Sequence, residues 1–63
     1  MTEREGAIIS AYTGTLFVSF PVFHKYVEEI MGRPVLTHEF TNKSVMEEIK
    51  NRSEEDFFKI HVE

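Results

Sequence analysis

Every second residue on each side of Thr13-Gly14 is apolar within residues 7–20, a period typical of two paired β-strands. The strands would meet at Thr13-Gly14, because glycine tolerates the positive φ of a tight hairpin turn. Successive side chains of a strand point to opposite faces, so one face of this hairpin would be wholly apolar: Ala7, Ile9, Ala11, Leu16, Val18 and Phe20. The pattern predicts an N-terminal β-hairpin at residues 7–20, preceded by a flexible lead-in at residues 1–6.

The second face of this hairpin would be mixed, with Ile8, Tyr12 and Phe17 among serines and threonines. These residues either pack under a C-terminal helix or form a contact surface for a partner, and the pattern leaves both open.

The next segment has the three-four spacing of an amphipathic helix, with Phe23, Tyr26, Val27 and Ile30 on one side. Pro21 suits a first helical turn, and Gly32 followed by Pro34 ends the helix. The sequence therefore predicts a helix over residues 21–31 that covers the hairpin.

The C-terminal part predicts a helical segment over residues 44–61. Ser44 and Glu47 have the spacing of a capping box, and Val45, Met46 and Ile49 would face inward. Ser53 precedes Glu54, Glu55 and Asp56, a second possible helix start, so one kinked helix and two helices are both open. Phe57, Ile60 and His61 would form the apolar side of its last part, and Thr37 would cap a short helical turn before it.

The fold class predicted is α+β: an N-terminal β-hairpin followed by two or three α-helices in one small domain over residues 1–63. Leu16 lies in the apolar face of this hairpin, so Leu16→Asp is expected to unfold the protein by burying an unpaired charge.

The small size of the chain favours self-association. A chain of 63 residues buries little surface for its length, and without cysteine it has no disulfide to compensate. We therefore expect a homodimer that joins hairpins edge to edge or packs C-terminal helices across a two-fold axis. The residues expected in the dimer interface or the core are Leu16, Phe17, Val18, Phe20, Phe57 and Phe58.

Charge and hydropathy narrow the classes of partner. The net charge is −4 and the seven basic residues are scattered, which disfavours direct binding to nucleic acid. No stretch approaches the roughly 20 apolar residues of a membrane span, and the polar, acidic start does not resemble a signal peptide. We expect a cytoplasmic protein without membrane contact.

Candidate chemistry is sparse. His24, His38 and Glu39 could serve a metal-dependent enzyme, but no second histidine lies four residues from the first as in a helical zinc motif. We expect no metal, no cofactor and no catalytic residues, and we expect a protein that is not an enzyme.

Three motifs together carry a resemblance: Ala11-Tyr12-Thr13-Gly14, Phe23-His24-Lys25-Tyr26, and Gly32-Arg33-Pro34-Val35 with Thr37-His38-Glu39. They resemble a family of very short phage and prophage proteins known as a domain of unknown function. In size and expected element order the chain also resembles small phage anti-defence proteins, such as the inhibitor of the Hachiman system.

The resemblance implies stoichiometric binding to a host defence protein in the host cytoplasm. The motif residues Tyr12, Thr13, Arg33, His38 and Glu39 would then be the interaction residues. A structural role is the alternative for three of them, with Tyr12 packed beside the turn and Arg33 paired with Glu39. The alternative function is an accessory protein of phage nucleic-acid processing.

Overall fold

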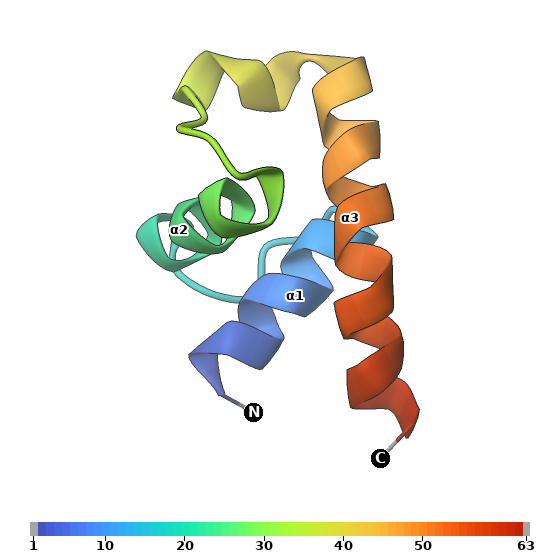
Figure 1. The fold of residues 1–63 in the computed structure, drawn as a ribbon. Coiled ribbons are helices and arrows are strands. Elements are labelled where there is room, and N and C mark those ends of the chain that lie inside the picture. Colours follow the sequence, from blue (N-terminus) through green and yellow to red (C-terminus); the bar gives the residue numbers. More distant parts are fainter. Residues whose placement is uncertain (1, 63) are drawn as a thin grey trace.

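All regular structure in the described part of the chain is helical. The computed structural model describes the backbone of residues 2–62 and the side chains of residues 2–60. Its elements are α1 (Glu3–Thr13), α2 (Phe20–Met31), the short 3-10 helix η1 (Thr37–Thr41) and α3 (Lys43–Val62). In Figure 1, α1 lies between α2 and α3, and η1 leads from the loop after α2 to the start of α3. The predicted α+β fold is wrong, because residues 2–62 contain no strand.

The first predicted strand is instead part of the helix α1, and residues 2–6 of the predicted flexible lead-in form its N-cap and first turn; residue 1 lies outside the described residues. Thr2 caps this helix: its hydroxyl accepts a hydrogen bond from the Glu5 amide (3.1 Å), and the Glu5 carboxylate accepts one from the Thr2 amide (2.9 Å). These two hydrogen bonds hold the pKa of Glu5 below its ordinary value. The capping box satisfies two backbone amides at the start of α1 that would otherwise lack partners.

Gly14 does adopt a positive φ, +79°, but it ends α1 rather than closing a hairpin. Residues 15–19 then form a loop without a strand to pair with. Ser10, which is buried, fastens this loop: its hydroxyl donates to the Gly6 carbonyl (2.7 Å) and accepts from the Phe17 amide (2.8 Å).

The helix expected at residues 21–31 is found as α2, Phe20–Met31, and it ends at Gly32 with φ +69°. Phe23, Tyr26 and Val27 are buried as the spacing predicts. Three polar contacts join α2 to the other helices. Glu29 pairs with Arg4 of α1 (2.6 Å), the Tyr26 hydroxyl donates to Asp56 of α3 (2.8 Å), and the Arg52 guanidinium of α3 donates to the Ile30 carbonyl (3.3 Å).

The C-terminal segment is a single continuous helix, α3. Of the two alternatives that the sequence left open, one helix is therefore correct and two helices are wrong. Ser53 starts no new helix, because it is fully buried within α3 and its hydroxyl donates to the Lys50 carbonyl (3.0 Å). Ser44 is not the cap either. The Asn42 side chain caps α3, accepting from the amides of Ser44 (2.9 Å) and Val45 (3.4 Å). His61 lies outside the described side chains.

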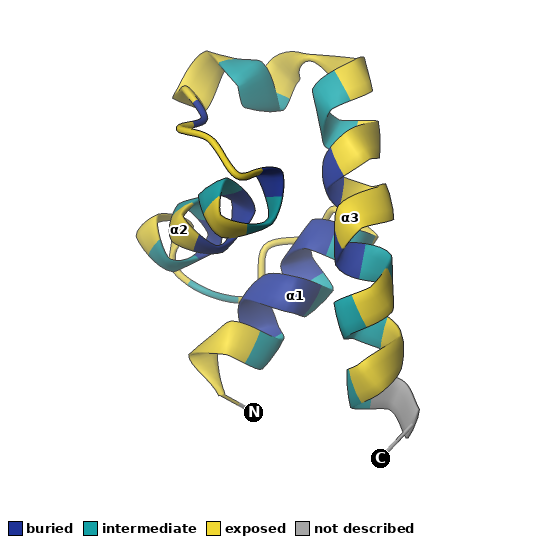
Figure 2. Cartoon of the chain, viewed as in Figure 1, coloured by how far each residue is buried: buried dark blue, intermediate teal, exposed yellow. Residues whose placement is uncertain are grey.

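The core gathers where the three helices meet. Figure 2 shows buried residues along the middle of α1 and on the parts of α2 and α3 near it. Ala7 and Ala11 have small side chains, which lets α1 come close to both other helices. The buried apolar residues are Ala7, Ile8, Ala11, Phe23, Tyr26, Val27, Met31, Val35 and Ile49.

Leu16 lies outside this core. Its side chain is 52% exposed, so the expectation that Leu16→Asp buries a charge and unfolds the protein has no basis in this structure. The physical reason is that the apolar face of the predicted hairpin does not exist: Ala7 and Ala11 are on α1, whereas Leu16 is in the loop that follows it.

Candidate functional site

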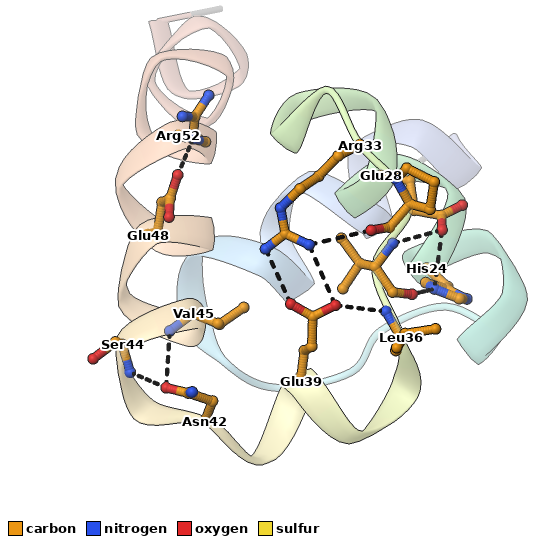
Figure 3. Close-up of polar contacts among 12 residues, drawn as sticks. His24, Glu28, Arg33, Leu36, Glu39, Asn42, Ser44, Val45, Glu48 and Arg52 are labelled. Carbon is orange, nitrogen blue, oxygen red and sulfur yellow. Dashed lines mark hydrogen bonds and ion pairs between the residues drawn. The ribbon is translucent and has the colours of Figure 1, made fainter.

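The motif Gly32-Arg33-Pro34-Val35 builds a loop that is fastened to α2. Val35 is buried, its amide donates to the Glu28 carboxylate (2.8 Å), and its carbonyl accepts from Nε2 of His24 (2.5 Å). His24 Nε2 and Glu28 Oε2 are also 3.5 Å apart. Both polar groups of one buried backbone residue are therefore held by side chains one turn apart on α2 (Figure 3).

Arg33 and Glu39 close the other side of this loop. The guanidinium of Arg33 makes two contacts with the Glu39 carboxylate (3.0 and 3.3 Å), and Glu39 also accepts from the Leu36 amide (2.8 Å). The Arg33 contact and the Leu36 hydrogen bond hold the pKa of the Glu39 carboxyl below its ordinary value. The ion pair that the sequence offered as the structural role of Arg33 and Glu39 is present (Figure 3).

The five residues predicted for interaction fall into separate groups. Arg33 and Glu39 are paired to each other, and His38 is exposed on η1 beside them in the chain. Tyr12 and Thr13 are at the end of α1. Tyr12 is half-buried and stacks on Phe57 of α3 with ring centroids 4.2 Å apart, and the Thr13 hydroxyl donates to the Ile9 carbonyl (2.7 Å). No described contact joins the two groups, and most of these side chains hold the fold.

The chain also has an apolar groove that the sequence did not predict. Its walls are Leu16, Phe20, Phe23, Phe40 and Met46, with Ser10 and Gly14 completing the lining, and it encloses about 180 Å³. No charged side chain lines it. The groove is therefore suited to an apolar side chain rather than to a charged or strongly polar ligand.

Aromatic rings form most of the groove. The Phe40 ring lies 5.5 Å from the rings of both Phe20 and Phe23, and the His24 ring is 5.6 Å from Phe40. Phe20 is 39% exposed and Leu16 is 52% exposed. Two large apolar side chains that line one hollow thus remain open to water, at a cost in free energy that a partner would relieve.

A second hollow adjoins the groove and carries charge of both signs. It shares Gly14 and Met46 with the groove and adds Lys43, Glu47 and Lys50 of α3. Lys50 lies over the Tyr12 ring at 5.6 Å, and neither lysine forms an ion pair within residues 2–60. These side chains give the apolar groove a charged border on the α3 side.

A larger hollow between α1 and α2, about 350 Å³, is a weaker candidate. It is lined by Glu3, Arg4, Ala7, Val22, Lys25, Tyr26 and Glu29. Two of its charged side chains are already paired within the chain: Arg4 forms an ion pair with Glu29 and also lies over the Tyr26 ring at 5.4 Å.

The remaining expected interface residues are dispersed. Val18 and Phe57 pack partly against the core, whereas Phe17 and Phe58 are 51% and 48% exposed. Among the described residues, no three histidine, cysteine or acidic side chains come close enough to bind a metal, so His24, His38 and Glu39 form no such cluster. Within the described helices, none is long and apolar enough to cross a bilayer.

Phe40 and Met46 are groove residues that sequence reasoning did not assign to a site. Phe40 is the one apolar residue between Leu36 and Val45, in an otherwise polar stretch. An isolated aromatic residue there is a usable signal for a contact, although it does not say with what. Met46 was expected to face inward, and it packs partly against the core while lining the groove.

Comparison with known proteins gives a family but no activity. No curated protein and no solved structure matches this chain. A protein-family profile does match residues 3–62, nearly the whole length, and it is described as a domain of unknown function. The chain therefore belongs to the DUF7736 family, a domain of unknown function.

Proposed function

We propose that this chain is a binding protein, not an enzyme, and that it acts by docking another protein on the apolar groove. The observation that carries the proposal is the groove itself: an uncharged hollow lined by aromatic rings, in which Leu16 and Phe20 are partly open to water. Exposed apolar side chains that line a hollow are a usual mark of a protein contact site.

The narrower proposal concerns the target. The resemblance to short phage and prophage proteins supports a host defence protein as the target, bound stoichiometrically in the host cytoplasm. The Hachiman system is the example suggested by similar length. The helical fold removes the second support for that example, the shared order of a hairpin followed by helices, so it rests on length alone.

The binding proposal can be tested with two matched variants. Leu16→Asp places a charge at the groove, and Leu36→Asp makes the same change at a residue that is 60% exposed and lies outside the groove lining. The tagged wild-type chain and both variants are used to capture proteins from bacteria that carry an antiphage defence system, such as Hachiman. Circular dichroism of each purified variant verifies that its helices are intact.

The proposal expects one host protein to be retained by the wild type and by Leu36→Asp and lost with Leu16→Asp. In the same cells, expression of the wild type should restore phage plating, and Leu16→Asp should not. Capture of the same proteins by all three chains, or of none by the wild type, would refute docking at the groove. Capture through the groove without any effect on plating would refute only the defence target.

A further inference from the structure

We propose that, in the free protein, the groove is covered by a second copy of this chain, in a two-fold dimer. The inference rests on the proposed function only in treating the groove as a surface that contacts protein. In the absence of a target, a second copy occupies that surface. Binding of a target would therefore compete with formation of the dimer.

The shape of the groove region meets the requirement of a two-fold interface. Such an interface joins the same patch on both subunits, so the patch must be complementary to itself. Here the hollow of about 180 Å³ and the partly exposed apolar side chains of Leu16 and Phe20 belong to the same patch. Each copy can therefore cover the exposed apolar side chains of the other with the same surface.

Charge also favours this face over the rest of the surface. The chain has net charge −4, so two copies repel each other unless carboxylates are kept apart. No charged side chain lines the groove, and its neighbouring hollow holds Lys43 and Lys50 with Glu47. Two of the other hollows carry two carboxylates each, Glu3 and Glu29 in one and Glu5 and Asp56 in another, beside equal numbers of basic side chains, so among these hollows the groove is the one without carboxylates in its lining.

A two-fold axis beside the groove would bring Lys43 or Lys50 of one copy toward Glu47 of the other. None of these three side chains forms an ion pair within its own chain over residues 2–60, although Lys50 also lies over the Tyr12 ring, so Lys43 and Glu47 are the first candidates for a contact across the axis. Such rim pairs set the orientation of the subunits more than they add affinity.

The size of the chain supplies the driving force. For a chain of 63 residues without disulfides, apolar burial roughly balances the entropy lost on folding. Covering Leu16 and Phe20 adds apolar burial outside the core. Because the patch is small, the interface belongs to the weak class below about 1,200 Å² in total, and dissociation is expected within the micromolar range.

The test measures mass and stability of the purified protein with no host protein present. Sedimentation velocity and thermal melting are followed from about 1 to about 200 μM, because dimer coupling makes both depend on concentration. The variants are Leu16→Asp and Phe20→Ser at the groove, with Leu36→Asp as the matched control. Circular dichroism verifies the fold, and Phe20→Ser serves if Leu16→Asp lacks helical structure.

The expected result is a wild type and a Leu36→Asp variant that shift from monomer to dimer mass and melt at higher temperature as concentration rises. The folded groove variant should remain monomeric over the same range, with a melting temperature unmoved by dilution. A wild type that is monomeric throughout, a folded groove variant that dimerises like the wild type, or open-ended growth beyond the dimer would each overturn the inference.

Failure of this inference is separable from failure of the proposed function. A monomeric wild type that still captures a host protein in a Leu16-dependent way refutes the dimer and leaves the docking proposal intact. A groove-dependent dimer that captures no host protein and does not affect phage plating refutes the docking proposal alone.

Discussion

At the scale of single residues, Tyr26 joins all three helices. Its ring is buried on α2, its hydroxyl donates to Asp56 of α3, and Arg4 of α1 lies over the ring. Burial and the hydrogen bond to Asp56 raise the pKa of the Tyr26 hydroxyl above its ordinary value, so it remains a donor at neutral pH.

Tyr26→Phe is expected to lower the free energy of unfolding by about 1–2 kcal/mol, since it removes a hydrogen bond to a charged acceptor that is partly open to water. Urea denaturation followed by circular dichroism measures the change. Tyr12→Phe is the control, because the Tyr12 hydroxyl makes no hydrogen bond within residues 2–60 and only its ring packs on Phe57. An equal loss in both variants would contradict the role of the Tyr26 hydroxyl.

The Glu39 carboxyl predicts a pH dependence. Its pKa is lower in the folded protein than its ordinary value of 4.5, chiefly because of Arg33. Below that value the unfolded chain binds more protons than the folded one, so the stability from this group is present above pH 4.5 and is lost as pH falls through the folded pKa.

Glu39→Gln should therefore lower the stability at neutral pH and flatten its fall in acid, which melting between neutral pH and about pH 3 measures. Glu54→Gln is the control, because the Glu54 carboxylate forms no ion pair within residues 2–60 and lies outside the proposed contact surface. If Glu39→Gln has the same acid profile as the wild type, the Arg33–Glu39 pair does not stabilise the loop.

At the scale of elements, the N-cap of α3 differs from the one that the sequence predicts. Ser44 and Glu47 have capping-box spacing, yet Asn42 is the residue whose side chain reaches the free amides. Asn42 and Ser44 are both good N-cap residues, so the spacing alone does not choose between them.

Asn42→Ala is expected to cost about 0.5–2 kcal/mol of stability, the usual range for loss of an N-cap. Ser44→Ala should change little, because its side chain is exposed and caps nothing in the structure. Chemical denaturation of both variants measures the two losses in the free energy of unfolding. A larger loss for Ser44→Ala would restore the capping box predicted from the sequence.

At the scale of the whole molecule, the close approach of α1 to α2 depends on a small side chain. Ala7 is fully buried and lines the same hollow as Val22 and Tyr26 of α2. The Ala7 side chain has no exposed surface, so a larger residue must displace its buried neighbours unless it extends into that hollow.

Ala7→Leu is therefore expected to destabilise the protein by about 1–3 kcal/mol through overpacking. Glu3→Leu adds the same side chain at an exposed position of the same helix and should have a much smaller effect, as thermal melting of the two variants will show. A stabilised Ala7→Leu variant would instead show that the added side chain fills the hollow between α1 and α2.

Features that depend on neighbouring residues in the chain could be predicted from the sequence. The helix over residues 21–31, its stop at Gly32, the inward residues of α3 and the positive φ of Gly14 all follow from local spacing and steric limits, and all are present. The Arg33–Glu39 pair is also local, because only the loop and η1 separate the two residues.

The tertiary structure alone decided between hairpin and helix for residues 3–13. Ala7 and Ala11 fit an alternating strand and a helix equally well, since positions 7 and 11 share a face in both, and Gly14 suits a hairpin turn as well as a helix end. The Thr2–Glu5 capping box favoured the helix, but burial of α1 against α2 and α3 is what stabilises it.

The groove could not be predicted from the sequence, for a related reason. It brings together the loop after α1, the start of α2, η1 and the start of α3, which are far apart in the chain. Local periodicity reports which face of one element is apolar, but it does not report which faces of several elements meet without covering one another. That outcome depends on how the helices pack, and it leaves Leu16 and Phe20 open to water.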